Sequence, residues 1–224
     1  MRCVWNAATT VTLHDERLAF CWGGSTAMRR TQFESLNIRQ YWDKALSDDL
    51  QMTRAIRAAG LAIHFVPQAL VTSSDATTLR GFWTFAHRQL IIVRICTPDH
   101  WRWAFTFCSL FIAGGLSVVF LAVAGFADWG PSKLATWLAV VGAIVLIGLG
   151  GLRALLRQVS LRLVMGKSLT KADFWWDVIG TMSIAGGMHM HLLLSSLFSR
   201  KFVWRNVEYE MISPDETRIV RRLN

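Results

Sequence analysis

Residues 103–127 have the sequence WAFTFCSLFIAGGLSVVFLAVAGFA, in which no side chain carries a formal charge. Two more uncharged stretches follow, between Lys133 and Arg153 and between Asp177 and Arg200. Each stretch is close to the roughly 20 residues that cross about 30 Å of hydrocarbon as a helix. The sequence therefore predicts two to three transmembrane segments, at about residues 103–127, 134–152 and 178–199.

The composition of the chain supports a membrane location. Of its 224 residues, 53% are hydrophobic and only 17% are charged, which is too little charge to cover a soluble domain of this length. The net charge of +9 comes from Lys and Arg residues that cluster beside the apolar segments. Because no aromatic-basic recognition motif accompanies them, we expect the basic residues to face anionic lipid headgroups and not nucleic acid.

The distribution of basic residues predicts which side of the membrane each loop occupies. The turn at residues 128–132 has no Lys or Arg, whereas the linker at residues 153–171 is basic. Basic loops stay in the cytoplasm, so we expect this linker and the amino-terminal residues there, in a multi-pass protein of a bacterial inner membrane. The third segment leaves two alternatives: it crosses and puts the basic tail outside, or it re-enters and leaves on the cytoplasmic side.

The residues before the membrane segments have the pattern of a partial α/β domain. An amphipathic helix is predicted from Asp49, with Ser47 or Asp48 as its N-cap and Gly60 as its stop. Short apolar runs with turn residues between them predict strands at residues 9–13, 18–22, 25–28 and 61–66.

A second amphipathic helix is predicted over residues 78–95, with Pro98 just beyond its end. Its many apolar residues exceed those of an ordinary surface helix, while cations such as Arg80 and Arg88 keep it from spanning the bilayer. This composition favours a helix that lies in the plane of the headgroups. The alternative is a helix buried against the core of the domain.

The adjacent carboxylates Asp48 and Asp49 are the first candidates for chemistry. An Asp at a helix start can cap free N–H groups and meet the positive end of the helix dipole. Two consecutive carboxylates cannot both cap well, which leaves one to point into a cleft. There it would act as a general base that takes a proton from an acceptor hydroxyl.

The stretch Trp22-Gly23-Gly24-Ser25-x-x-x-Arg29-Arg30, followed by Ser47-Asp48-Asp49-Leu50 and residues 55–60, resembles the second half of family-2 glycosyltransferases. It is most similar to their membrane-bound, ceramide glucosyltransferase-like branch. The resemblance covers residues 5–97, and more loosely extends to residue 210. It implies part of a GT-A (Rossmann-like) domain at residues 1–76, an interfacial helix at 77–100, a membrane region at 101–199 and a basic tail at 200–224.

The resemblance also implies a reaction and residues for it. A sugar would pass from a nucleotide-sugar to a lipid or membrane-associated hydroxyl with inversion at the anomeric carbon. Asp49 matches the catalytic base of the family and Asp48 its acidic neighbour. Gly23, Gly24 and Ser25 match the loop near the acceptor and the donor phosphates.

Two further motifs of the family concern the donor diphosphate. The Gln/Arg-x-x-Arg-Trp motif has its nearest match at residues 85–89, where Arg88 would meet the diphosphate and Gln89 replaces Trp. A headgroup or surface contact is the alternative role for Arg88. The stretch Trp204-Arg205-Asn206 resembles the Trp-Arg-Gly that follows the last membrane segment of the family. If that match holds, the tail is cytoplasmic.

The family's first half supplies an Asp-x-Asp that holds a divalent metal, Mg or Mn. Before residue 48 the acids have no such spacing, and they are Asp15, Glu16, Glu34 and Asp43. We therefore expect the chain to be the carboxyl-terminal portion of a longer enzyme, with the donor-binding amino-terminal half missing. In isolation it should bind donor poorly and show little activity.

Two other functions remain open. The second hypothesis is a non-catalytic membrane module or remnant that binds lipid or a partner chain. A metal- or haem-binding protein is the third hypothesis, based on residues 188–191, Met-His-Met-His, although positions i and i+2 face different sides of a helix. The cysteines lack metal-ligand spacing and are expected to be reduced, structural thiols, at Cys3, Cys21, Cys96 and Cys108.

Overall fold

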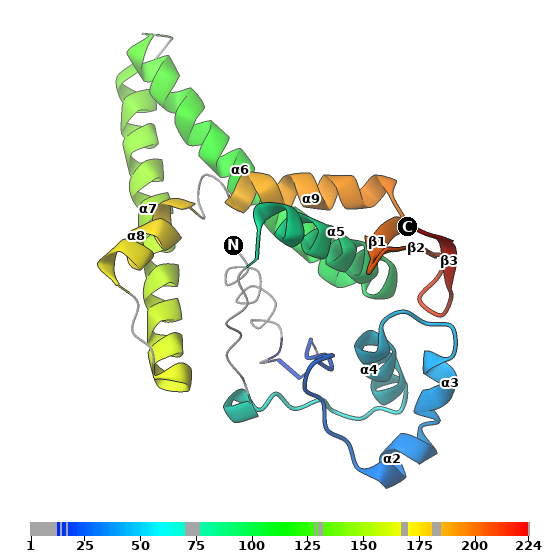
Figure 1. Ribbon diagram of the computed structural model, residues 1–224. Helices are drawn as coiled ribbons and strands as arrows, with labels where there is room; N and C mark the ends of the chain where they lie inside the picture. Colours follow the sequence, from blue (N-terminus) through cyan, green and yellow to red (C-terminus); the bar gives the residue numbers. More distant parts are fainter. Residues whose placement is uncertain are drawn as a thin grey trace. The chain divides into compact units, whose positions relative to one another are not determined.

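The computed structural model describes residues 13, 15–16, 18–69, 77–127, 129, 132–166, 170–180 and 185–223. These residues are mostly helical, with one small sheet of three strands (Figure 1). The chain forms two compact units, which are described separately. The first unit is Met1–Arg102 with Leu192–Asn224, and the second is Trp103–His191.

The first unit contains the short helices α2 and α3, the longer helices α4 and α5, one 3-10 turn and a sheet. Their bounds are Arg30–Ser35 for α2, Ile38–Trp42 for α3, Asp48–Ala58 for α4, Pro67–Ala69 for η2 and Leu79–Cys96 for α5. The strands are Lys201–Trp204 for β1, Val207–Met211 for β2 and Thr217–Arg222 for β3. Helices α7 (Ser132–Met165) and α8 (Lys171–Gly180) belong to the second unit. Helix α6 (Pro98–Phe126) begins in the first unit and continues into the second, and α9 (Gly186–Phe198) begins in the second and ends in the first.

Helix α4 confirms the predicted start and stop signals. The Ser47 hydroxyl accepts a hydrogen bond from the Leu50 N–H at 3.4 Å, as an N-cap does. At the other end Gly60 has a φ of 68°, and the Leu61 N–H donates to the Ile56 carbonyl at 3.1 Å. This is the Schellman arrangement, in which a left-handed glycine lets the chain fold back on the last turn.

The strands predicted in the amino-terminal part are wrong. Residues 18–22, 25–28 and 61–66 contain no strand, and the one predicted at residues 9–13 lies outside the described residues except for Leu13. A strand needs a neighbouring backbone to pair with. In residues 19–23, alternate backbone groups bond instead to side chains of α4, which accounts for the absence of pairing there.

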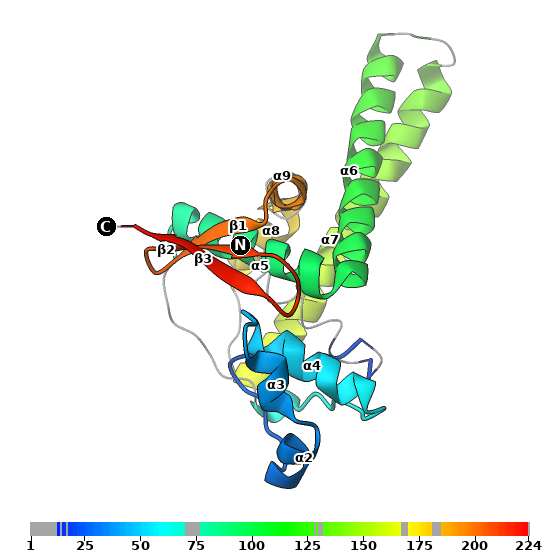
Figure 2. The same ribbon diagram turned by 90° about the vertical axis from the view of Figure 1, so that its right-hand side faces the viewer.

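The sheet lies in the tail, where sequence patterns did not predict one. Its three strands are antiparallel in the order β1-β2-β3, as Figure 2 shows. Strands β1 and β2 are joined by Arg205 and Asn206, whose φ angles are 47° and 61°. Two consecutive positive φ angles are typical of the type I′ hairpin turn, in which Asn is tolerated as Gly is.

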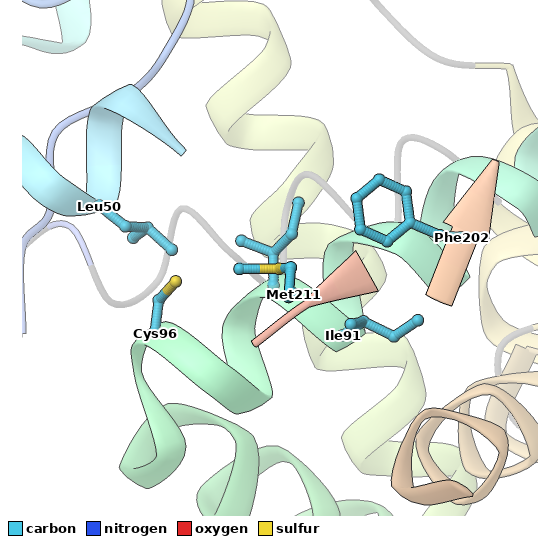
Figure 3. Close-up of a cluster of buried hydrophobic side chains, with 6 residues drawn as sticks. Leu50, Ile91, Cys96, Phe202 and Met211 are labelled. Atoms are coloured by element: carbon cyan, nitrogen blue, oxygen red, sulfur yellow. The ribbon is translucent and has the colours of Figure 1, made fainter. Parts of the chain in front are cut away.

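The core of the first unit joins segments from both ends of the chain. Leu50 on α4 packs with Ile91 and Cys96 on α5 and with Phe202 and Met211 of the sheet (Figure 3). Burial raises the pKa of the Cys96 thiol to about 12, so this cysteine is an inert part of the core. The face of α5 that carries these residues is therefore buried in protein. This agrees with the alternative prediction for this helix, in which it packs against the core of the domain.

Helices α6 and α7 cover the first two predicted membrane segments. Within the described ranges, two helices are long and apolar enough to cross a membrane, Pro98–Phe126 and Lys133–Ser160. Only 6% and 11% of their most apolar windows are buried within the protein, unlike core helices of a soluble domain. The two helices approach closely, because a Cβ on Gly142 would lie 2.7 Å from Cγ2 of Val118.

The third predicted segment is divided between α8 and α9. Helix α8 ends at Gly180, residues 181–184 lie outside the description, and α9 begins at Gly186. Helix α8 packs on α7 through Asp177, whose Oδ1 lies 2.5 Å from Nη1 of Arg157. The backbone carbonyl of Asp177 also accepts a hydrogen bond from Arg153 at 3.0 Å. The buried Asp177 carboxylate and the arginines of α7 therefore hold the two helices together through paired charges.

Candidate functional site

The extended segment at residues 19–23 lies along one face of α4. The Gly23 N–H donates to Asp49 at 3.1 Å, the Cys21 N–H donates to the Thr53 hydroxyl at 2.9 Å, and Arg57 donates to the Ala19 carbonyl at 2.9 Å. Four residues of helix rise about 6 Å and two residues of extended chain about 6.6 Å, so the two spacings match. The side chains at positions 49, 53 and 57 can therefore contact residues 23, 21 and 19, one residue each.

The Asp49 carboxylate is held at both oxygens. Oδ1 accepts from the Leu50 N–H at 2.8 Å and from the hydroxyl of Ser47, while Oδ2 accepts from Gly23. The side chain is half-buried at the first turn of α4, in contrast to the exposed Asp48. A carboxylate offers about four acceptor positions, so Oδ2 keeps one for a proton from a substrate. This carboxylate is fixed in orientation yet able to accept.

The glycine-rich turn closes against this carboxylate. A Cβ built on Gly23 would lie 2.9 Å from Oδ2 and 3.4 Å from Cγ of Asp49. The turn itself is tied by the Thr26 hydroxyl, which accepts from the Trp22 N–H at 3.0 Å and donates to the Trp22 carbonyl. The absence of a side chain at position 23 therefore allows the backbone to approach the carboxylate.

A second group of predicted residues meets where α5 faces the tail hairpin. The guanidinium carbon of Arg88 lies 5.2 Å from the centre of the Trp204 ring, and that of Arg205 lies 5.7 Å from the same ring. Burial lowers the pKa of the Arg88 guanidinium, which marks a partly desolvated cation. Two arginines beside one aromatic plane form a cationic surface suited to phosphate.

The core described above connects the two groups. Leu50, next to Asp49, packs in the same cluster as Phe202, two residues before Trp204. Gly24 and Ser25 are exposed in the glycine-rich turn, and Gln89 is half-buried on α5. These three predicted residues take no part in the contacts of Asp49 or Arg88 given above.

A comparison with models of protein families assigns residues 5–216 to Glycosyl transferase family 21. The chain belongs to glycosyl transferase family 21. This confirms the resemblance to the ceramide glucosyltransferase-like glycosyltransferases, and the match extends through the membrane helices into the tail. No curated protein and no solved structure matches the chain.

The resemblance to the family leads to the expectation of a divalent metal, Mg or Mn, in the full-length enzyme. Among the described residues, no three His, Cys, Asp or Glu side chains gather to hold a metal ion. The carboxylate of Asp49 is instead occupied by backbone and hydroxyl donors. No step below is derived through a metal.

Several residues of the site were not predicted from the sequence. Arg205 was noted only as part of a motif, and the docking roles of Thr53 and Arg57 were missed. Their spacing from Asp49, at i+4 and i+8, places all three on one face of a helix and was a usable signal. Gln51 was also missed, because its partners Pro214 and Asp215 lie 163 and 164 residues away in sequence.

The side chain of Gln51 fastens the loop between β2 and β3 to α4. It is fully buried, and its amide donates to the Pro214 carbonyl and to Asp215 at 3.2 Å. Arg54, one turn further on, lies 2.5 Å from the Asp215 carboxylate. Because Asp49 lies in the first turn of α4, the tail of the chain supports the helix that carries the candidate base.

We expect Gln51→Leu to destabilise this support much more than Asp215→Ala. The leucine leaves the part-buried Pro214 carbonyl without its donor, which costs up to about 1–3 kcal/mol. The Arg54–Asp215 pair is 40% and 60% exposed, and such pairs contribute roughly 0–1 kcal/mol. Thermal unfolding in detergent, together with proteolysis of the loop at residues 212–217, measures the difference. Equal losses from both substitutions would contradict the assignment of Gln51 as the main contact.

Proposed function

We propose that the protein is an inverting glycosyltransferase that moves a sugar from a nucleotide-sugar to a hydroxyl of a lipid or membrane-associated acceptor. Membership in family 21 supports sugar transfer. The observation that carries the mechanism is the Asp49 carboxylate, held by Gly23 and Ser47 with one acceptor position of Oδ2 left over. The two helices of membrane-spanning length support an acceptor that resides in the bilayer.

In the proposed reaction Oδ2 of Asp49 removes the proton of the acceptor hydroxyl. The acceptor oxygen attacks the anomeric carbon from the face opposite the leaving group and forms the new glycosidic bond. The bond between that carbon and the diphosphate oxygen breaks, and the electron pair leaves with the nucleoside diphosphate. Base catalysis of this kind contributes roughly 10²–10⁴-fold to a rate.

The diphosphate that leaves carries negative charge, and Arg88 is proposed to meet it. Trp204 holds the Arg88 guanidinium from one side, and Arg205 adds a second positive charge beside the same ring. Charge-assisted bonds from guanidinium to phosphate are among the strong hydrogen bonds of proteins. Gly23, Gly24 and Ser25 are proposed to border the acceptor hydroxyl next to Asp49, and Gln89 to border the donor.

The core of the first unit also supports a membrane topology. Leu50 precedes the membrane helices and Phe202 and Met211 follow them, yet all three pack in one cluster. A single hydrophobic core cannot lie on both sides of a bilayer, so the chain between them must cross an even number of times. Helix α9 has 13 residues and a length of about 20 Å, which is too short to cross. We therefore propose that α6 and α7 cross and that the tail returns to the cytoplasmic side.

This topology predicts where reporters are accessible. A reporter fused after Asn224 should lie on the same side as one fused before Met1, and a tag inserted at residues 128–131 should lie on the opposite side. The basic residues of the linker place the first two in the cytoplasm. Recovery of the carboxyl-terminal reporter on the side of the inserted tag would refute an even number of crossings.

Sugar transfer is tested in membranes of cells that produce the protein from its own locus, because these keep every other component of the reaction. Radiolabelled UDP-glucose, UDP-galactose and UDP-N-acetylglucosamine serve as donors. Label should enter the lipid that chloroform extracts. The anomeric configuration of the transferred sugar should be opposite to its configuration in the donor. Absence of labelled lipid with all three, while the protein still binds lipid, would favour the non-catalytic membrane module.

A further inference from the structure

A cavity of about 380 Å³ lies where α9 ends and the sheet begins. Its lining combines three cationic side chains with one carboxylate and two apolar side chains. The cationic residues come from two separate elements, α5 and the start of the tail. The lining residues are Arg94, Leu197, Phe198, Ser199, Arg200, Lys201 and Glu210.

The cations of this cavity are only partly compensated. The negative charge of Glu210 on β2 is shared between two cations. Its strand partners are Lys201 on β1 and Arg218 on β3. Arg200 donates to the Ile212 carbonyl at 2.7 Å, and neither that bond nor the one from Arg94 to the Ser199 carbonyl at 2.9 Å neutralises a charge. Positive charge is therefore in excess around the cavity.

Arg94 is the least satisfied cation of this lining. Its Nε is buried and has no hydrogen-bond partner within the described part of the chain. Burial and the neighbouring charge of Arg200 both lower the pKa of the Arg94 guanidinium. An anion in the cavity would offset the repulsion between the guanidinium groups of Arg94 and Arg200.

The apolar part of the lining narrows the chemistry of that anion. Phe198 is 87% exposed and Leu197 is 39% exposed, at the end of the apolar helix α9. An amphiphile with a phosphate next to its acyl chains satisfies both parts of the lining, since cations meet the phosphate and Leu197 and Phe198 meet the chains. A soluble anion would leave these two apolar side chains in water.

We propose that the cavity beside Arg94 binds the headgroup phosphate of an anionic phospholipid. The bound lipid anchors the sheet at the membrane surface just where the chain leaves α9. This site is separate from the contacts of Asp49 and Arg88, and it does not depend on the proposed sugar transfer.

The test uses the full chain purified in a mild detergent, with phosphatidylglycerol or phosphatidylcholine added and retained lipid counted by native mass spectrometry. Each cation near an anionic surface contributes about a fivefold gain in affinity. We therefore expect Lys201→Gln to weaken phosphatidylglycerol binding about fivefold, and Arg94→Gln combined with Lys201→Gln to weaken it further. The matched control is Arg221→Gln, which makes the same charge change at a residue paired with Glu208 at 2.6 Å.

The alternative outcomes are distinct. Equal losses from Lys201→Gln and Arg221→Gln would show diffuse attraction and would overturn the site. Equal retention of phosphatidylcholine would overturn recognition of the charged headgroup. Stabilisation by inorganic phosphate that matches the effect of phosphatidylglycerol would assign the cavity to a soluble anion instead. Lys201 is exposed, so its variant reports on the site even if loss of the Arg94 contact to Ser199 disturbs folding.

Discussion

Asp49→Asn is expected to abolish sugar transfer to lipid, with a loss of roughly 10²–10⁴-fold, while the protein still inserts into membranes. Asparagine has nearly the same shape and can still occupy the first turn of α4, but its amide cannot take up the acceptor's proton. The Ser47 hydroxyl and the Leu50 N–H can still donate to the asparagine oxygen and keep the side chain at the first turn of α4. Its NH2 group cannot accept from the Gly23 N–H or take up a proton, so the rate falls because the proton acceptor is gone. Transfer of radiolabelled sugar into the lipid extract measures it.

The control for this experiment is Asp43→Asn, which makes the same change at an exposed residue just after α3. It should transfer sugar at the rate of the unaltered protein. Asp48→Asn should lower transfer less than Asp49→Asn, because Asp48 is exposed whereas Asp49 is half-buried. Unchanged turnover in Asp49→Asn, with normal amounts of protein in the membrane, would remove the proposed base.

Gly23→Ala is expected to cause the second largest loss. Its methyl group would lie 2.9 Å from Oδ2 of Asp49, closer than Cβ atoms approach other atoms in proteins. The carboxylate cannot retreat cheaply, because its other oxygen is bound by Leu50 and Ser47. Either the turn or the base must therefore move, and a misplacement of about 1 Å can cost on the order of 10²-fold in rate.

Gly24→Ala is the matched comparison for that substitution. Its Cβ would meet the Trp22 ring at 3.6 Å, an ordinary contact, so the two variants differ mainly in their distance to Asp49. We expect Gly23→Ala to lose at least about tenfold more activity than Gly24→Ala, in kcat more than in the KM for the acceptor. Equal losses would mean that the turn as a whole matters and that its contact with the carboxylate does not.

Local sequence signals predicted the parts of the fold that depend on neighbours along the chain. The start of α4 at Asp48 and its stop at Gly60 follow from hydrogen bonds within a few residues, which Ser47 and Gly60 specify by themselves. The same holds for α6 and α7, since the hydrocarbon thickness fixes how many uncharged residues a crossing needs. The pair Asp48-Asp49 was readable from the sequence as a helix start, and the resemblance to the family singled out Asp49 as the base.

Elements that depend on distant partners could not be predicted in this way. Residues 18–22 have the composition of a strand, but whether an extended segment pairs with a strand or a helix depends on what lies beside it. The sheet of the tail is similar, because its short strands β1 and β2 carry little pattern of their own. Gln51 gained its role only when the loop at Pro214 came to lie against α4.

The sequence alone determined that this chain has two stretches long and apolar enough to cross a membrane, that it resembles sugar-transferring enzymes, and that one helix begins with a pair of carboxylates. The tertiary structure decided which oxygen of Asp49 accepts from Gly23, and that Arg88 and Arg205 both lie beside the ring of Trp204. It also decided that the sheet of the tail packs on α4 and α5. The physical reason is the range of the interactions. Hydropathy and capping act over a few residues, whereas these contacts join positions 26 to more than 100 residues apart.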